Sequence, residues 1–208
     1  MYHPAERATV HARLALEGPD AERVYAGVGA QMGRVHSAVT ALHDPAQGPV
    51  TWWAAQDVRT WSQRPWNQDG KQLPLVHHAR ADLQVKFRDF HRLSAWLTEM
   101  ATVDGFGVDR VEWALTADRR SELVRTARTQ AVHEARSKAA AYAEALGLTD
   151  VRVVAIADAG MLGEGLHPED QGAGTFSRAA AMSGGEPLQL VPEDVEIAAS
   201  VDARFVAA

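Results

Sequence analysis

The sequence predicts an α+β fold in which helices pack on one face of a mainly antiparallel sheet. Several segments alternate apolar and polar residues with a period of two, the pattern of strands that bury one face. Other segments repeat apolar residues every three or four positions, the pattern of amphipathic helices. In chain order the segments read βαββαβ, then a long helix and two further strands, a start typical of ferredoxin-like arrangements. Strands with one polar face favour antiparallel pairing.

The first half of the chain supplies three predicted strands and a helix. Residues 6–17 alternate and predict a half-buried strand. Gly18-Pro19-Asp20 interrupts this strand and starts a helix that runs to Leu42. Val50 to Gln63 is rich in β-forming residues, and Leu75 to Phe87 shows the clearest alternation in the chain. These two segments predict a long hairpin.

The middle of the chain predicts two helices separated by a strand. Asp89 is the expected N-cap of a short helix that reaches Met100, and Val111 to Leu115 alternates as a strand. Asp118 is the expected N-cap of a long helix, which Gly147 ends in the left-handed conformation. One face of this helix carries small or apolar residues, which predicts close packing on a sheet. That face comprises Val124, Ala127, Ala131, Ala135, Ala139, Tyr142 and Leu146.

The last third of the chain predicts two strands on either side of an insertion. Val151 to Ile156 is apolar enough for a largely buried strand, and Val195 to Phe205 alternates as the closing strand. Residues 158–187 hold seven glycines and show no periodicity, which predicts a flexible Gly-rich insertion. The length of 208 residues predicts a single domain spanning residues 1–208.

Composition narrows the classes of function. The net charge of −6 argues against nucleic-acid binding, which needs basic patches. The chain has no cysteine, which excludes thiol nucleophiles and thiolate metal sites. No apolar run approaches the ~20 residues that span a bilayer. As written, the chain is expected in the cytoplasm, because charged residues are spread through its first 25 positions and leave no apolar signal-peptide core. A removed leader would place it in the periplasm or envelope.

No pattern in the sequence predicts a catalytic, cofactor or metal site. His77 and His78 are adjacent on a strand and point to opposite faces, and His36 and His43 lie two helical turns apart, so neither pair chelates an ion. The segment 172–177 resembles a glycine-rich phosphate loop only faintly, because no strand directly precedes it. No serine elbow is visible. We therefore expect a protein without enzymatic activity or cofactor.

Tryptophans mark the candidate interface. Trp52, Trp53, Trp61 and Trp66 lie within fifteen residues of one another. Adjacent Trp52 and Trp53 face opposite sides of a strand, so one of them lies off the core and is suited to anchor an interface or line a ligand groove. Core packing explains such a cluster equally well. Phe176 and Met182 in the insertion complete the candidate set, because such side chains can dock on a neighbour.

Several segments together give the chain a family resemblance. They are Gly18-Pro19-Asp20, Asp89-Phe90, the strand from Val111 to Leu115, and the alanine-rich helix with its Leu146-Gly147-Leu148 stop. The chain resembles the SIMPL-domain family, also called DUF541, nearly end to end. The resemblance implies no catalytic residues. It implies a bacterial protein with an envelope- or stress-related role and a tendency to form assemblies.

Two functions follow as hypotheses. The first is a self-associating interaction protein, a homo-oligomer with or without another protein partner. The alternative is a small-ligand-binding module that uses the Trp-rich hairpin or the Gly-rich loop. The state of association in solution distinguishes them.

Overall fold

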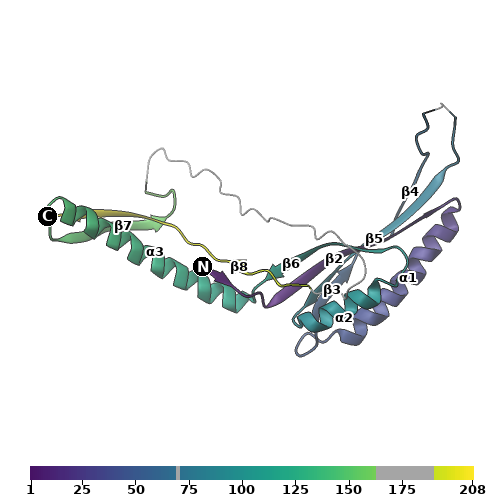
Figure 1. Ribbon diagram of the computed structural model, residues 1–208, viewed down its shortest axis with the longest axis horizontal. Coiled ribbons are helices and arrows are strands. Elements are labelled where there is room, and N and C mark those ends of the chain that lie inside the picture. Colours follow the sequence, from purple (N-terminus) through teal and green to yellow (C-terminus); the bar gives the residue numbers. More distant parts are fainter. Residues whose placement is uncertain (69–70, 163–189) are drawn as a thin grey trace. The chain divides into compact units, whose positions relative to one another are not determined.

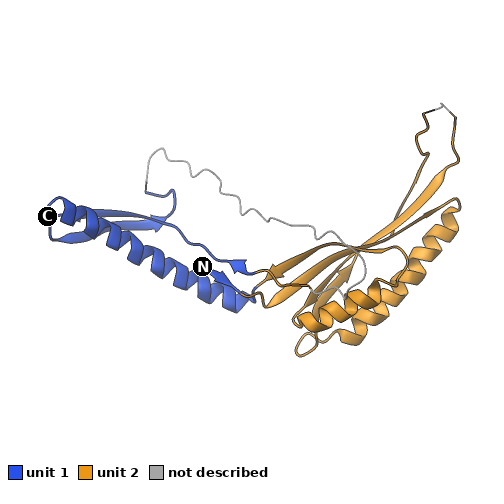
Figure 2. Ribbon diagram, viewed as in Figure 1, with its two compact units in different colours: residues 1–3, 115–177, 194–208 blue, residues 4–114, 178–193 orange. Residues whose placement is uncertain are grey.

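The computed structural model describes residues 1–68, 71–162 and 190–208, which form two compact units (Figure 2). Among the described residues, unit 1 holds residues 1–3, 115–162 and 194–208, and unit 2 holds residues 4–68, 71–114 and 190–193. The three helices and the antiparallel sheets of the described part confirm the α+β prediction. Most of the Gly-rich insertion lies outside the described residues, so its flexibility stays a prediction, as does the single domain.

A five-stranded antiparallel sheet forms the centre of unit 2 (Figure 1). Its path is β3-β5-β2-β6, and β4 also pairs with β5. The strands are β2 (Arg7–Gly18), β3 (Val50–Ala55), β4 (Arg59–Gln63), β5 (Val76–Phe87) and β6 (Phe106–Ala114). The predicted alternation of β2 and β5 is confirmed over most of each strand, where the inward-facing residues Ala8 to Leu14 and Ala79 to Phe87 are buried.

Both helices of unit 2 contribute to the core on one face of this sheet. They are α1 (Ala21–Leu42) and α2 (Phe90–Met100). Asp89 is the N-cap of α2, as predicted, and Asp20 is the N-cap of α1, so Pro19 lies before the helix and not in its first turn. Each aspartate accepts a hydrogen bond from the backbone N–H three residues later. The buried helical and strand residues form one cluster that includes Val28, Leu83 and Leu93. The opposite face of the sheet carries the polar side chains.

Asp44 shapes the turn between α1 and β3. Its Oδ1 accepts hydrogen bonds from the backbone N–H groups of Ala46, at 2.8 Å, and Gln47, at 3.2 Å. These bonds favour the carboxylate and hold the pKa of Asp44 below its usual value. The carboxylate thus accepts hydrogen bonds from two backbone N–H groups of the turn that have no strand partner.

Two strands of unit 2 differ from the predictions. The single strand expected over residues 50–63 is two strands, because Asp57 disfavours a ladder and Val58 turns toward the core. Strand β6 begins at Phe106, five residues earlier than expected. A bulge opposite His11 and Ala12 leaves consecutive residues exposed, which hides the alternation.

Unit 1 combines one long helix with short sheets. It contains α3 (Ala117–Ala145), β7 (Val151–Asp158) and β9 (Val201–Ala207), and β1 (Tyr2–His3) pairs with β8 (Val195–Glu196). The N-cap of α3 is Thr116, not Asp118, which lies in the first turn, where its charge complements the helix dipole. Gly147 has φ of 73°, as expected for the residue that ends a helix.

The terminal strands of unit 1 correct two expectations. The closing strand is divided into β8, which pairs with β1, and β9, which pairs with β7. Between them, Ile197 exchanges backbone hydrogen bonds with Met1, and its side chain packs with Leu115 and Leu123 and is 2% exposed. The strand β7 is not largely buried: Val154 is 55% exposed. α3 packs more on β9 than on β7, so β7 is only partly covered.

The alanines of α3 differ in how closely they pack. Ala127 and Ala143 are buried, whereas Ala131, Ala135 and Ala139 are half-buried and line an open groove beside β9. The predicted face is therefore only partly correct, because Ala127 is its one buried member, whereas Tyr142 and Leu146 are 69% and 77% exposed.

We expect Ala143→Leu to lower the free energy of unfolding by about 1–3 kcal/mol, because the added atoms overpack a filled site. Ala135→Leu is the matched control, and we expect it to cost less, because its side chain enters the groove. Thermal unfolding followed by circular dichroism compares the two variants. Equal losses would show that the groove is filled in solution.

Candidate functional site

Two tryptophans lie on the polar face of the unit 2 sheet. Trp52 pairs with Lys86, whose Nζ lies 5.7 Å from the ring centre, and Trp61 pairs with His78. The rings of Trp61 and His78 stack with centres 5.0 Å apart and an angle of 6° between their planes. Both tryptophans are nearly half exposed, at 44% and 45%. The polar face therefore presents one exposed tryptophan ring on each of the edge strands β3 and β4.

The other candidate residues are separate from this face. Trp53 points to the core side and packs edge-on against His36, with ring centres 4.9 Å apart. Trp66 follows β4 and is 81% exposed. Phe176 and Met182 lie outside the described residues. The structure thus brings Trp52 and Trp61 to one face but does not gather the whole predicted set into a single patch.

A charged network occupies the centre of the polar face. Asp109 forms ion pairs with Arg13 and with Arg80, and Arg80 also pairs with Asp82 at 2.6 Å. In the sequence, the alternation of β2 and β5 places their charged residues on one face of each strand. Only the pairing of the strands brings the opposite charges together. These side chains are partly exposed, so the pairs stabilise the fold only modestly.

Histidines complete the polar face. His11 lies 3.3 Å from Glu112, and His78 lies 3.3 Å from Glu17. Ser62 Oγ and His77 Nδ1 are 2.7 Å apart at the exposed edge. No group of three metal-ligating side chains occurs in the described ranges. The charged side chains of this face mainly satisfy one another.

The β7–β9 sheet of unit 1 presents the second candidate surface. Four of its aliphatic side chains are about half exposed: Val153, Val154, Ile156 and Val206. A groove of about 570 Å³ runs between α3 and β9 and is lined by Ala135, Ala139, Val201 and Phe205, among others. The sequence suggested that β7 is apolar but wrongly placed it inside a core. The exposure of these aliphatic residues is the feature of this candidate surface that sequence reasoning missed.

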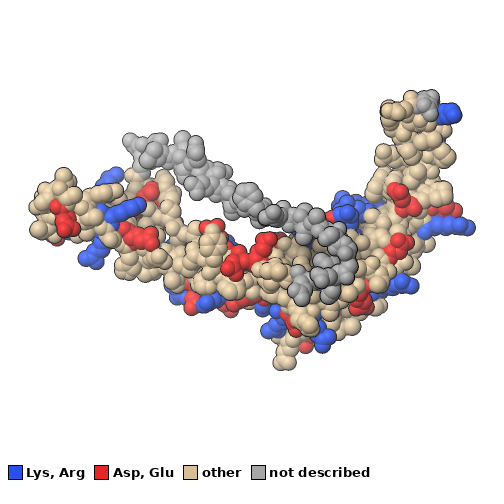
Figure 3. Space-filling model, viewed as in Figure 1, with Lys and Arg blue, Asp and Glu red and all other residues tan. Residues whose placement is uncertain are grey.

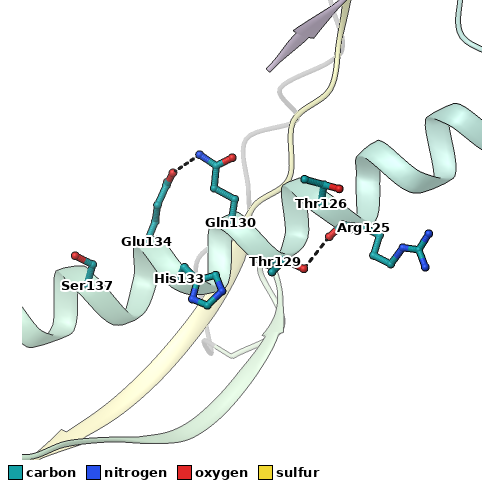
Figure 4. Close-up of a pocket in the computed structure, with 7 residues that line it drawn as sticks. All are labelled: Arg125, Thr126, Thr129, Gln130, His133, Glu134 and Ser137. Carbon is teal, nitrogen blue, oxygen red and sulfur yellow. Dashed lines mark hydrogen bonds between the residues drawn. The ribbon is translucent and has the colours of Figure 1, made fainter.

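A polar face of α3 forms a shallow hollow next to these elements (Figure 4). All seven side chains drawn there come from α3 itself. Gln130 donates a hydrogen bond to Glu134 at 3.0 Å, and the Thr129 hydroxyl donates to the carbonyl of Arg125. Such bonds along one helix are typical of a solvated face. On the face of the molecule that Figure 3 shows, acidic and basic side chains are likewise mixed.

The comparisons identify the family of this protein. The fold defines an α+β protein with antiparallel sheets. The chain belongs to the SIMPL family, described as "Protein of unknown function (DUF541)", whose model matches residues 1–205. The predicted resemblance is therefore confirmed, and the family model spans elements of both compact units. Among the described residues, no helix is long and apolar enough to cross a membrane.

The other comparisons add no activity. A search of curated proteins found no match. A crystal structure of a candidate amidohydrolase/peptidase from Burkholderia cenocepacia is 15% identical, with a TM-score of 0.28. That match covers 71% of this chain and 34% of the other, so the chain spans about a third of that protein's length. At this TM-score the likeness carries no inference about activity.

Proposed function

We propose that this SIMPL-family protein is a non-enzymatic interaction protein that self-associates through the β7–β9 sheet. The observation that carries the proposal is the exposure of Val153, Val154, Ile156 and Val206 on a sheet of only two strands. An isolated pair of strands is marginally stable in water, and a larger sheet or better coverage stabilises it. A second copy supplies both.

The energetics favour this surface. Complete burial of a valine or isoleucine side chain contributes about 1.5–3 kcal/mol. In a symmetric dimer each aliphatic side chain at the contact is buried twice, once on each copy. Several half-exposed side chains therefore contribute enough to offset part of the entropy lost when two molecules associate.

The sheet edge formed by β6 in unit 2 contrasts with this surface. It carries the bulge near Asp109 and the charged side chains of Arg110 and Glu112. Bulges and charges are common devices that prevent sheet edges from joining. This difference supports unit 1 as the region of association.

Replacing Val206 by lysine is expected to reduce the mass of the assembly, because Val206 lies on β9, is 47% exposed, and its replacement would place a charge against the second copy. Tyr25→Lys is the matched control: Tyr25 is 56% exposed on α1 of unit 2, and we expect no change in mass. Light scattering coupled to gel filtration measures both variants from low to high micromolar concentration. A wild-type protein that stays monomeric at high micromolar concentration would refute self-association.

Binding of a small ligand is the second candidate function. It is supported by the exposed rings of Trp52 and Trp61 on one face. A strictly monomeric protein would favour this candidate, because the aromatic surface needs no second copy.

A further inference from the structure

We infer that two copies join edge to edge through β9, antiparallel and in the register that places Ala203 opposite Ala203 of the second copy. The inference rests on the proposed self-association and names its contact. It follows from the free edge of β9, the order of charges along it and the groove beside it.

The edge of β9 is available for pairing. Within the described residues, β9 pairs only with β7, and its backbone forms no hydrogen bond outside that pairing. The outward N–H and C=O groups of the strand are therefore a template for another strand. The same does not hold for β7, where Val154 is an extra residue between two ladder positions and distorts the edge.

The charges along β9 select one register. Residues 201–205 read Val-Asp-Ala-Arg-Phe. When a two-fold axis runs perpendicular to the sheet, each residue lies opposite a residue of the second copy. The two residue numbers of every such pair have the same sum, which is even. Centring on Ala203 places Asp202 opposite Arg204 of the second copy, and the symmetry repeats the pair. Centring on Asp202 or on Arg204 instead places like charges opposite each other, which destabilises a sheet.

Both charged groups have capacity left for a partner. Asp202 accepts one hydrogen bond, through Oδ2, from the backbone N–H of Gly160 at 2.7 Å. Arg204 donates through one terminal nitrogen to the carbonyl of Leu162 at 3.3 Å. A carboxylate accepts several hydrogen bonds and a guanidinium donates five, so these local contacts leave atoms for the second copy.

The groove accommodates the apolar residues of the same register. Val201 and Phe205 lie on the face of β9 that lines the groove with Ala135 and Ala139 of α3. The register places Phe205 of the second copy opposite Val201, on that same face. Methyl-sized side chains on the helix leave room there for an aromatic ring. The joined sheet then has four strands, which exceeds the size at which a sheet becomes stable on its own.

Charge reversal tests this contact in the full-length protein. Asp202→Arg and Arg204→Asp each place two like-charged pairs across the axis, so each is expected to weaken self-association about tenfold or more. The double variant D202R/R204D restores both pairs and is expected to recover wild-type association. A mixture of the two single variants is expected to form mixed dimers, because all four charges then pair. Light scattering and differently tagged copies report these results.

A cysteine variant tests the register independently. The chain contains no cysteine, so Ala203→Cys introduces a single thiol, which the register places opposite its own copy. We expect Ala203→Cys to form a disulfide-linked dimer under mild oxidation. Ala207→Cys is the matched control on the same strand, and we expect little linked dimer because its two thiols lie far apart in this register.

The outcomes separate the two proposals. The β9 contact is overturned, and self-association still stands, if the wild-type protein self-associates and neither charge reversal weakens that association. The same holds if Ala207→Cys forms the linked dimer and Ala203→Cys does not. A strictly monomeric wild-type protein overturns both. Circular dichroism of each variant checks that it is folded, and recovery in the double variant excludes misfolding as the cause of the loss.

Discussion

Trp96→Ala is expected to lower the free energy of unfolding by about 3–5 kcal/mol, the cost of removing a large aromatic side chain from a core. Trp96 is 1% exposed and lies between Phe87 and Phe106, with ring centres 5.4 Å and 5.8 Å away. These contacts join α2 to two strands of the sheet. Urea unfolding followed by circular dichroism measures the loss, because that signal does not depend on the removed indole.

Trp96→Phe is the matched variant. It retains an aromatic ring between Phe87 and Phe106 and removes the indole N–H, for which the described residues offer no hydrogen-bond partner. An unpaired buried donor costs about 1–3 kcal/mol, so its removal offsets part of the lost packing. We expect a net loss below about 1.5 kcal/mol. A loss as large as that of the alanine variant would show that the N–H is paired in solution.

Gly105→Ala is expected to destabilise unit 2 by about 2–4 kcal/mol, from backbone strain and overpacking together. Gly105 has φ of 77°, and a Cβ there would lie 2.4 Å from the carbonyl oxygen of Ala15. Neither strand can move away easily, because the Gly105 carbonyl accepts a hydrogen bond from the Ala15 N–H at 2.9 Å. Denaturant unfolding measures the effect.

Gly29→Ala is the control for this substitution. Gly29 lies in the exposed part of α1, and an added Cβ meets no other atom within 4 Å. The same change is therefore expected to stabilise the protein by about 0.5–1 kcal/mol, because alanine favours a helix over glycine. Two glycine-to-alanine changes of opposite sign separate backbone strain from a general effect of the methyl group. Equal effects would refute the clash at Gly105.

Local patterns predicted the parts of the fold that have local causes. Alternation marked β2 and β5, because each strand buries one face over most of its length. The Gly18-Pro19-Asp20 break marked the start of α1, Asp89 that of α2 and Gly147 the end of α3, because such signals act through atoms a few residues away. The family resemblance was visible for the same reason, since it rests on short segments.

The candidate surfaces depended on longer-range contacts. The opposite faces of Trp52 and Trp53 followed from strand geometry, but their surroundings did not, since Lys86 and His36 come from other elements. The network around Asp109 needs β2, β5 and β6 side by side. No local pattern reports such neighbours.

By itself the sequence determined the fold class, the order of the helices and the main strands, and most of the helix ends, because periodicity and capping are local properties. Only the tertiary structure decided which apolar strand is covered. An apolar segment such as β7 reads as buried in the sequence, yet Val154 is exposed because α3 lies mainly over β9. Burial depends on what packs against a strand, and that is settled by contacts between residues distant in the chain.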